Sequence, residues 1–507
     1  DIGSDWPRFG NDAGGSQYSP LDQINTANVA DLKVAWTHHS GDVAEPGGEV
    51  GATSLETVPI HANNTLYFCT PFNRVFALDP ATGEEKWIFD PHEAEVNGKR
   101  LLDKPRRTST CRGVAYWQAA EPRPDTPCEK RVFKADWAGQ TYAIDADTGK
   151  ACEDFGAGQG HPGYVSHWDF ESYGEGTSRG MSSPPTVVAD IVVTTQSAND
   201  GIANATDGFV RAFDVRSGEL KWSFDPIPED KRDVTGAANV WSTTSADPVR
   251  GLVFVPTTSP STDYYGGERT FDIPYSDATV ALSAETGEVV WHFQTVHHDM
   301  FDYDLIGHPL LINIEKDNRR VDVAVQQTKM GWLYVLDRDT GTPIFPVEER
   351  PVPQSDVPGE NSSPTQPVPV GIDAFAGQQI DREKLFGLTP LDKAWCQGEF
   401  DKMRYEGMYT PPSMQGSLLF PSALGGGNWG GAAFDPDSNT LVVKAENLAT
   451  RLKFVAKESD ADDKNFPGVD YLTRPLIGTP YRVVGEVFMS PLGIPCSPTP
   501  WGTLTAI

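Results

Sequence analysis

Short segments in which apolar and polar residues alternate recur along the whole chain. Thr65–Cys69 and Leu252–Pro256 are examples, and each has asparagine, glycine or proline close to its ends. A period of two is typical of β-strands, because successive side chains point to opposite faces of a sheet. The pattern predicts many short strands joined by tight turns, with few long helices.

A longer pattern is built on these strands. It consists of a strand, the turn sequence Asp-x-x-Thr-Gly or a close variant, and a second strand that usually ends in an aromatic residue. Five copies occupy residues 77–87, 143–149, 212–222, 281–291 and 335–345. The aspartate can accept hydrogen bonds from the turn amides, and glycine supplies a positive φ.

The copies recur roughly every 55–70 residues, which exceeds a minimal four-stranded blade and leaves room for loops on one face. The repeat therefore predicts an all-β chain, a β-propeller forming one domain over residues 1–507. An unrelated run of hairpins is the alternative interpretation.

Both ends of the repeat array are irregular. Trp36 resembles the tryptophan of a repeat whose earlier strands do not precede it, and Trp501–Ile507 begins a further copy that stops before its turn. A strand without its neighbour leaves an unpaired sheet edge. We therefore expect a propeller whose C-terminal blades are incomplete in this chain, with a C-terminal fragment missing.

Composition excludes some partners. The formal net charge of −30 would repel phosphates, so no nucleic-acid partner is expected. A run of about 18 apolar residues is absent from the sequence, and the chain starts without a basic segment followed by an apolar one. We expect neither a membrane span nor a signal peptide within it.

Six cysteines are spread along the chain: Cys69, Cys111, Cys128, Cys152, Cys396 and Cys496. None forms a Cys-x-x-Cys or Cys-x-x-Cys-His motif, so covalent haem is not expected. Cys128 and Cys152 flank a predicted β-hairpin, and we expect these two to pair first. For the others, disulfides and free buried thiols both remain open.

Longer motifs carry a resemblance to a known family. Segments 5–11 and 18–21 resemble the start of dehydrogenases that use pyrroloquinoline quinone (PQQ). Further segments resemble the membrane-bound glucose, quinate and shikimate dehydrogenase branch: 66–78, 110–116, 297–304, 403–413 and 491–496. The resemblance runs in order from Asp5 to Ile507. It implies an eight-bladed propeller of the quinoprotein alcohol dehydrogenase type, with the quinone on its axis above a divalent cation.

The resemblance also assigns the groups that carry the reaction. Asp302 matches the base that takes the alcohol proton while hydride passes to the quinone. Lys329 matches the cation that contacts the quinone oxygens and stabilises the reduced form. The alternative without a catalytic role is that Asp302 caps backbone amides in a turn and that Lys329 is a solvated surface residue. Asp299 and Asp304 are expected to support the site, although an acid at position 304 marks lanthanide use in methanol dehydrogenases.

For the metal, Asp200 matches a carboxylate ligand, although an Asn-Asp-Gly turn would also explain this aspartate. Ser259 stands where methanol dehydrogenases have asparagine and the sugar-oxidising branch has threonine, which leaves the second ligand in doubt. Calcium prefers oxygen donors, so we expect calcium or magnesium before a lanthanide.

For the cofactor, Trp241 matches the tryptophan that stacks on the quinone rings, although a tryptophan of the blade core would give the same signal. Glu56, Arg112, Ser182 and Asn428 match polar groups around the cofactor oxygens. Arg112 could equally pair with a structural acid.

Two departures narrow the substrate. Thr110 precedes Cys111, so the adjacent cysteines of methanol dehydrogenases are missing. Thr108 stands where glucose dehydrogenase has a histidine near the substrate, which favours quinate or shikimate over glucose. The family further implies ubiquinone as the electron acceptor. It also implies a periplasmic location, with attachment to the inner membrane through a segment absent here. A methanol- or ethanol-type quinoprotein and a non-enzymatic propeller scaffold are the alternatives.

Overall fold

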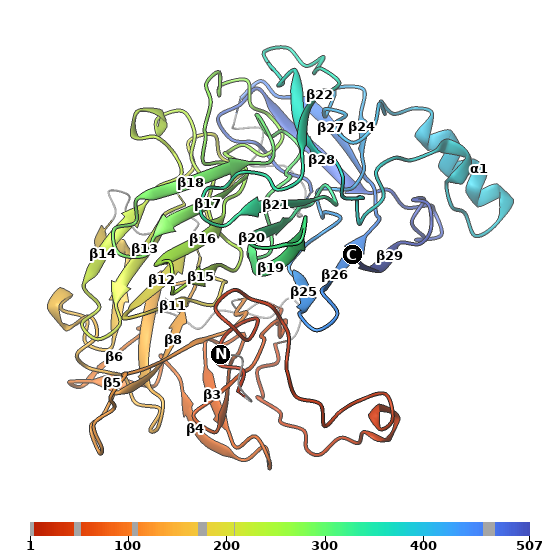
Figure 1. Ribbon diagram of the computed structural model, residues 1–507. Helices are drawn as coiled ribbons and strands as arrows, with labels where there is room; N and C mark the ends of the chain where they lie inside the picture. The colour runs from red at the N-terminus through yellow and green to blue at the C-terminus, as the bar shows by residue number, and fades with distance from the viewer. Residues whose placement is uncertain (1–4, 45–51, 104–109, 171–179, 207, 460–471) are drawn as a thin grey trace.

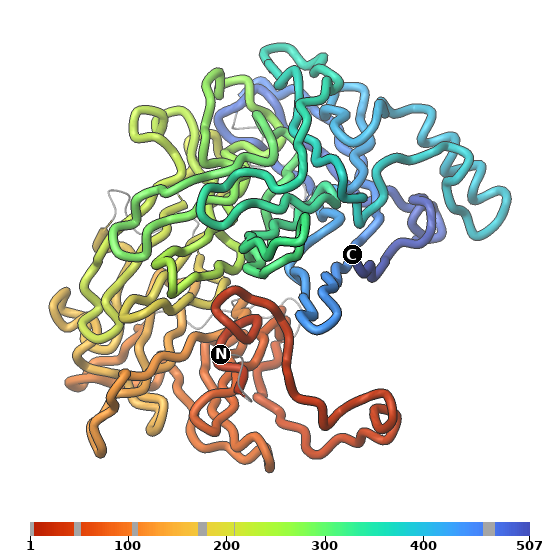
Figure 2. Tube along the Cα trace, in the orientation of Figure 1, coloured from red at the N-terminus to blue at the C-terminus, as the bar shows by residue number. Residues whose placement is uncertain are grey.

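Strands fan out around a common axis and make up most of the regular structure (Figure 1). The computed structural model describes residues 5–44, 52–103, 110–170, 180–206, 208–459 and 472–507. The trace in Figure 2 follows the chain around the axis, sheet by sheet, from the red N-terminal segment to the blue C-terminal one.

The N-terminal half contains four-stranded antiparallel sheets. They comprise β1–β4 (Ile60–Ala62, Thr65–Cys69, Val75–Leu78, Glu85–Phe89), β7–β10 (Ala115–Gln118, Lys130–Ala135, Gln140–Asp145, Tyr164–Ser166), β11–β14 (Thr186–Val188, Ile191–Thr195, Val210–Asp214, Leu220–Phe224) and β15–β18 (Ser245–Asp247, Leu252–Pro256, Ala278–Ser283, Val289–Gln294). A small hairpin, β5 (Glu95–Val96) and β6 (Lys99–Arg100), projects from the first of them.

The C-terminal half is less regular. Its sheets are β19–β21 (Leu310–Lys316, Arg319–Gln327, Leu333–Asp337), β22–β23 (Val347–Pro351, Thr365–Pro369), β24-β27-β28 (Ser417–Leu419, Thr450–Ala456, Tyr481–Val487) and β25-β26-β29 (Ala432–Asp435, Thr440–Glu446, Gly502–Ala506). The helix α1 (Pro390–Phe400) projects from this half, and Thr389 caps it through the Asp392 amide. Among the residues described, no helix is both long and apolar enough to cross a membrane.

Neighbouring sheets meet along their first strands, since β7, β11, β15 and β19 contact one another in sequence. These first strands are therefore innermost. Because each second strand runs antiparallel to the first, residues that precede a first strand and residues that follow a second strand lie at the same end of the propeller. This end collects most of the predicted site residues.

The repeat turn behaves as predicted. The Asp79 carboxylate accepts hydrogen bonds from the amides of Ala81 and Thr82, both at 2.9 Å, and Asp214 does the same in its own copy. The glycine that ends each turn has a positive φ, for example 73° at Gly287.

Tryptophans join adjacent repeats. Trp87, Trp222 and Trp291 each donate their indole N–H to a carbonyl in the next repeat turn, at 2.8 to 3.0 Å. Each ring lies directly against the glycine of that turn, at Gly149, Gly287 and Gly341 respectively. Trp36 makes the same contact with Gly83 and donates to Pro80 at 3.2 Å, as the sequence predicts for a docking tryptophan.

Two copies of the repeat depart from the expected strand-turn-strand form. After the turn of copy 143–149, only Ala151 pairs with Ile144, and the outer strand β10 forms after an excursion. After the turn of copy 335–345 no fourth strand forms among the described residues, and β19–β21 remains three-stranded. Pro343 and Pro346 lack the N–H groups that a strand needs there.

An N-terminal segment, residues 6–18, crosses the innermost strands of several sheets. Its backbone bonds to the innermost strands β1, β15, β19 and β25 through His61, Ala246, Leu311 and Phe434. The Nε2 of the buried His308 donates to the Gly15 carbonyl at 2.8 Å. This segment therefore links the first sheet to the last.

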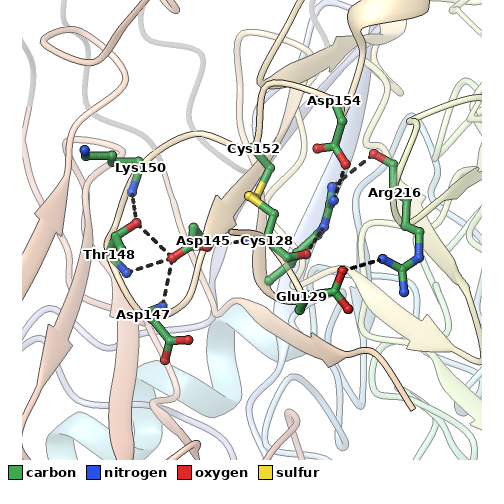
Figure 3. The surroundings of a disulfide bond; sticks show 10 residues. Cys128, Glu129, Asp145, Asp147, Thr148, Lys150, Cys152, Asp154 and Arg216 are labelled. Atoms are coloured by element: carbon green, nitrogen blue, oxygen red, sulfur yellow. Dashed lines mark hydrogen bonds and ion pairs between the residues drawn. A yellow bond between two sulfur atoms is a disulfide. The ribbon is translucent and has the colours of Figure 1, made fainter. Parts of the chain in front are cut away.

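All six cysteines form disulfides: Cys69–Cys111, Cys128–Cys152 and Cys396–Cys496. The predicted pair Cys128–Cys152 is confirmed. Figure 3 shows it beside the repeat turn, where the Asp145 carboxylate accepts from the amides of Thr148 and Cys128. The alternative of free buried thiols is wrong, because each sulfur lies against a partner from another segment.

Candidate active site

The loop between β18 and β19 brings two acids to a buried lysine. Lys329, which follows β20 and has no exposed surface, places its Nζ 2.9 Å from Asp302 Oδ1 and 3.2 Å from Asp304 Oδ2. The same ammonium donates to the Asp302 carbonyl at 2.7 Å. The interpretation of Lys329 as a solvated surface residue is therefore wrong.

The two acids have opposite electrostatic character. Burial raises the pKa of Asp302 well above its ordinary value, although Lys329 acts in the opposite direction. Burial also works to raise the pKa of Asp304, but Lys329 and the Ser259 amide outweigh it and lower that pKa. Asp302 thus has the raised proton affinity that suits a base, while Asp304 stays ionised.

Aromatic rings lie beside this pair. The Trp241 indole N–H donates to Asp304 Oδ2 at 3.3 Å, and its ring meets Trp429 edge to face at 5.2 Å between centroids. The Arg112 guanidinium lies over Trp429 at 3.7 Å from the ring centroid. It also forms an ion pair with Glu56 at 2.9 Å. Glu56, Arg112 and Trp241 are therefore connected through Trp429, as one polar and aromatic surface.

The remaining predicted cofactor residues lie at the same end. Asn428 precedes Trp429, its side chain accepts from the Trp429 amide, and its carbonyl accepts from Gln327. Ser182 is buried, and its carbonyl accepts from the Arg112 amide at 3.2 Å. The disulfide between Cys69 and Cys111 fixes the chain directly before Arg112.

The two predicted metal ligands approach the acids from different sides. Ser259 donates its amide to Asp304 at 2.9 Å, and its hydroxyl lies between Asp277 and Asp299. Asp200 instead pairs with Arg474, which also holds Asp263 at 2.7 Å. Among the described residues no hydrogen bond or ion pair joins Asp200 directly to Ser259, so this ligand set stays a prediction.

A cation fits this region on charge and on donor chemistry. Six buried or largely buried aspartates (Asp200, Asp263, Asp277, Asp299, Asp302 and Asp304) gather around three cations (Lys329, Arg269 and Arg474). Burial raises the pKa of Asp263 and Asp277 well above the ordinary range. The oxygens Asp277 Oδ2, Thr258 Oγ1 and Asn239 Oδ1 are buried without a hydrogen-bond partner. Calcium prefers such hard oxygen donors.

A second cluster does not qualify as a metal site. Cys128, Cys152 and Asp154 are the one group of three ionisable ligand atoms within 4.8 Å of one another in the parts of the chain that are described. Their two sulfurs are joined to each other, as Figure 3 shows, and Asp154 pairs with Arg131. Cysteine binds a metal as a thiolate, and neither sulfur can form one while the disulfide is intact.

Several residues of the site were not predicted: Tyr264, Asp263, Arg269, Asp277, Trp429 and Arg474. Tyr264 donates its hydroxyl to Asp302 Oδ2 at 3.2 Å, and Arg269 donates to the Asp299 carbonyl at 2.8 Å. Trp429 stands next to the predicted Asn428 and could have been found there. Thr108, the residue used to judge the substrate, lies outside the described residues.

These features define a β-propeller with a polar, acid-rich site at one end of its axis, which is the architecture of quinoprotein dehydrogenases. The model of the PQQ family, described as glucose/ethanol/alcohol dehydrogenase, β-propeller domain, matches residues 6–507. The chain belongs to this family, and the predicted all-β fold of quinoprotein type is confirmed.

Its relatives include dehydrogenases named for glucose and for quinate or shikimate. The chain is 36% identical to quinoprotein glucose dehydrogenase A of Acinetobacter calcoaceticus, over 99% of this chain and 65% of the relative. It is 37% identical to the quinate/shikimate dehydrogenase (quinone) of Acinetobacter baylyi, over 99% of this chain and 64% of the relative. The chain thus spans less than two thirds of the length of either relative.

Solved structures agree on the fold. A europium-containing methanol dehydrogenase superposes with a TM-score of 0.65 at 19% identity, covering 99% of this chain and 76% of that one. The quinohemoprotein alcohol dehydrogenase of Comamonas testosteroni gives a TM-score of 0.63 at 20% identity, covering 100% of this chain and 68% of that one.

Proposed function

We propose that this chain is the catalytic part of a PQQ-dependent dehydrogenase that oxidises a polyol or a cyclic hydroxy acid, with quinate or shikimate first and glucose or another sugar second. The observation that carries the proposal is the buried Asp302–Lys329 pair beside Trp241, in a chain that belongs to the quinoprotein family. The relatives named for glucose and for quinate support both substrate classes.

In this proposal the chain positions the alcohol and takes its proton. Asp302 accepts the proton of the substrate hydroxyl at a carboxylate oxygen, while Tyr264 and Lys329 hold that carboxylate from two sides. PQQ, when bound, supplies the acceptor for the hydride that leaves the carbinol carbon, so the alcohol becomes a carbonyl. Trp241 would offer a face for the cofactor rings, and Arg112, Glu56, Ser182 and Asn428 would meet its oxygens.

We assign the metal position to Asp200 and Ser259, with calcium or magnesium as the ion. The pairing of Cys111 with Cys69, 42 residues away in the sequence, disfavours a methanol-type enzyme, in which adjacent cysteines form the ring over the quinone, and with it the lanthanide alternative.

We further propose that residues 1–507 belong to one domain, an eight-bladed ring in the whole protein. Trp36 docks on Gly83 as an outer-strand tryptophan does, yet Leu32 and Val34 beside it are 57% and 83% exposed. At the other end β29 carries Leu504, which is 74% exposed. A further C-terminal segment that pairs with the chain beside Trp36 and with β29 would complete the ring. A periplasmic site at the inner membrane, with ubiquinone as acceptor, agrees with the three disulfides and with the word quinone in the relative's name.

The test is reconstitution with PQQ and calcium or magnesium, followed by dye reduction with quinate, shikimate, glucose and ethanol in parallel. Turnover of quinate or shikimate that disappears in Asp302→Asn supports the proposal. Turnover of glucose alone would contradict the interpretation that Thr108 favours quinate or shikimate over glucose. Binding of PQQ without turnover of any alcohol by the full-length protein would reject the assigned chemistry. Failure to bind PQQ would favour a propeller scaffold.

A further inference from the structure

A buried acid from a separate segment grips the loop that carries Asp302. Glu360 lies between β22 and β23, and only 2% of its side chain is exposed. Its Oε1 accepts from His298 Nε2 at 2.8 Å, and its Oε2 accepts from the Gly266 amide at 2.6 Å. One carboxylate thus joins two other loops of the site.

These two loops hold the proposed base and its hydrogen-bond donor. His298 stands four residues before Asp302, and Gly266 stands two residues after Tyr264, whose hydroxyl donates to Asp302 Oδ2 at 3.2 Å. A shift of Glu360 would therefore move the Asp302 carboxylate relative to the Tyr264 hydroxyl that donates to it.

The loop has a conformation that needs such support. His298 and Asp302 have φ values of 45° and 58°, in the left-handed region that residues with a Cβ adopt reluctantly. Conformations of this kind persist where the surroundings hold them. Arg269 contributes from the other side, since it donates to the carbonyls of Asp299 at 2.8 Å and Thr262 at 3.2 Å.

Glu360 is itself held firmly. Val357 is buried in the main core cluster, and the Tyr481 hydroxyl donates to the Pro358 carbonyl at 3.1 Å. Burial works to raise the pKa of Glu360, but His298, the Gly266 amide and Arg269 outweigh it and lower that pKa. The carboxylate is therefore ionised at neutral pH and can accept both hydrogen bonds.

We propose that Glu360 is a positioning residue for Asp302: through His298 and Gly266 it fixes the distance between the base and Tyr264. The inference rests on the proposed role of Asp302 and extends it to a residue more than fifty positions away. Glu360 contacts neither of the assigned metal ligands, nor any group assigned to the cofactor, in the contacts of the described chain.

The neighbouring histidine offers a matched control. His297 Nε2 meets Glu349 Oε1 at 3.0 Å, the same kind of contact one residue earlier, but these side chains are 36% and 53% exposed. A glutamate-to-glutamine change at Glu349 therefore removes an equivalent pair without disturbing a buried one.

The test compares Glu360→Gln with Glu349→Gln in the full-length, PQQ-loaded enzyme. Glutamine keeps the shape of glutamate, but its amide nitrogen cannot accept a hydrogen bond, so one of the two contacts is lost. A misplacement of about 1 Å can cost about 100-fold in rate. We expect Glu360→Gln to lower kcat by about 10- to 100-fold, with KM and PQQ affinity within about threefold of wild type. Substrate deuterated at the carbinol carbon should show a larger isotope effect, and Glu349→Gln should match wild type.

A wild-type kcat and isotope effect in Glu360→Gln would overturn the proposal. So would losses of kcat, PQQ affinity and unfolding midpoint in parallel, which indicate a merely structural role. If Glu360→Gln does not fold, His298→Phe removes the donor instead and should give the same kcat loss, with His298→Gln restoring it in part. Asp302→Asn separates the two levels: activity in that variant refutes the base assignment, whereas a dead Asp302→Asn beside a normal Glu360→Gln refutes only the positioning role.

Discussion

The contact between Trp222 and Gly287 allows the strength of blade-to-blade docking to be measured. A Cβ at Gly287 would lie 2.7 Å from Trp222 Cδ2 and 2.8 Å from two further ring atoms. The ring cannot easily turn away, because its N–H donates to Ala284 at 2.8 Å and only 6% of the residue is exposed. Gly287→Ala must therefore distort the junction between two sheets.

The expected cost has two parts. The φ of 73° at Gly287 costs an alanine about 1–2 kcal/mol, and overpacking adds about 1–3 kcal/mol, which gives about 2–5 kcal/mol in total. Gly251 is the matched control, because its φ is 65° but its Cβ would meet nothing within 4 Å. Gly251→Ala should cost only the backbone part, about 1–2 kcal/mol.

Urea unfolding of both variants, followed by tryptophan fluorescence, measures the difference between the two free energies of unfolding. Both changes reduce the entropy of the unfolded chain equally, so this contribution cancels. We expect Gly287→Ala to be less stable than Gly251→Ala by about 1–3 kcal/mol. Equal destabilisation of the two variants would refute the claim that tryptophan docking joins the repeats.

Other predictions concern the site and the N-terminal segment. Because the pKa of Asp302 is raised, kcat/KM should fall as the pH decreases through a value above 3.8, the ordinary pKa of this carboxyl group. Lys329 lowers the pKa of Asp302, so in Lys329→Met any remaining activity should fall at a higher pH than in the wild type. A fall in kcat/KM near pH 4 in both enzymes would contradict this reasoning. Arg112→Gln should weaken PQQ binding by about 10- to 100-fold in a fluorescence titration, with the unfolding midpoint unchanged, because charged hydrogen bonds contribute about 1.5–3 kcal/mol. Burial lowers the pKa of His308, so its neutral form favours folding; that stability should be present above the unfolded pKa of 6.5 and be lost as pH falls through the folded value. His308→Gln should flatten this loss in urea titrations between about pH 4 and 7.

The regular part of the fold was predictable because the repeat turn is local chemistry. An aspartate, two amides and a glycine decide it within five residues, so β3 and β13 end where the turn motif begins. β17 ends in the same way at Ser283, whose hydroxyl accepts from the Thr286 amide at 3.2 Å. The outer strands depend on more distant events. In copy 335–345 prolines remove the donors, and in copy 143–149 the chain turns to place Cys152 against Cys128.

The site was predictable wherever a single segment carries it. Asp302, Lys329 and Trp241 lie in compact motifs, and the structure brings all three together. Arg474 gave no such signal, because its partners Asp200 and Asp263 are 274 and 211 residues away. Contacts of this length arise only when loops from distant sheets converge at one end of the propeller.

The pKa values of Asp302 and Asp304 are shifted in opposite directions, and contacts with residues from distant segments explain the difference. The two acids share one loop, are both buried and both touch the same ammonium, so burial and the contact with Lys329 do not by themselves separate the base that the family motif indicates from its neighbour. Asp304 receives two further donors, the Ser259 amide and the Trp241 indole, and these favour its ionised form. Asp302 receives only the Tyr264 hydroxyl beyond Lys329 in the contacts of the described residues, too little to offset burial. Proton affinity at this site is therefore set by which strand ends converge on each oxygen.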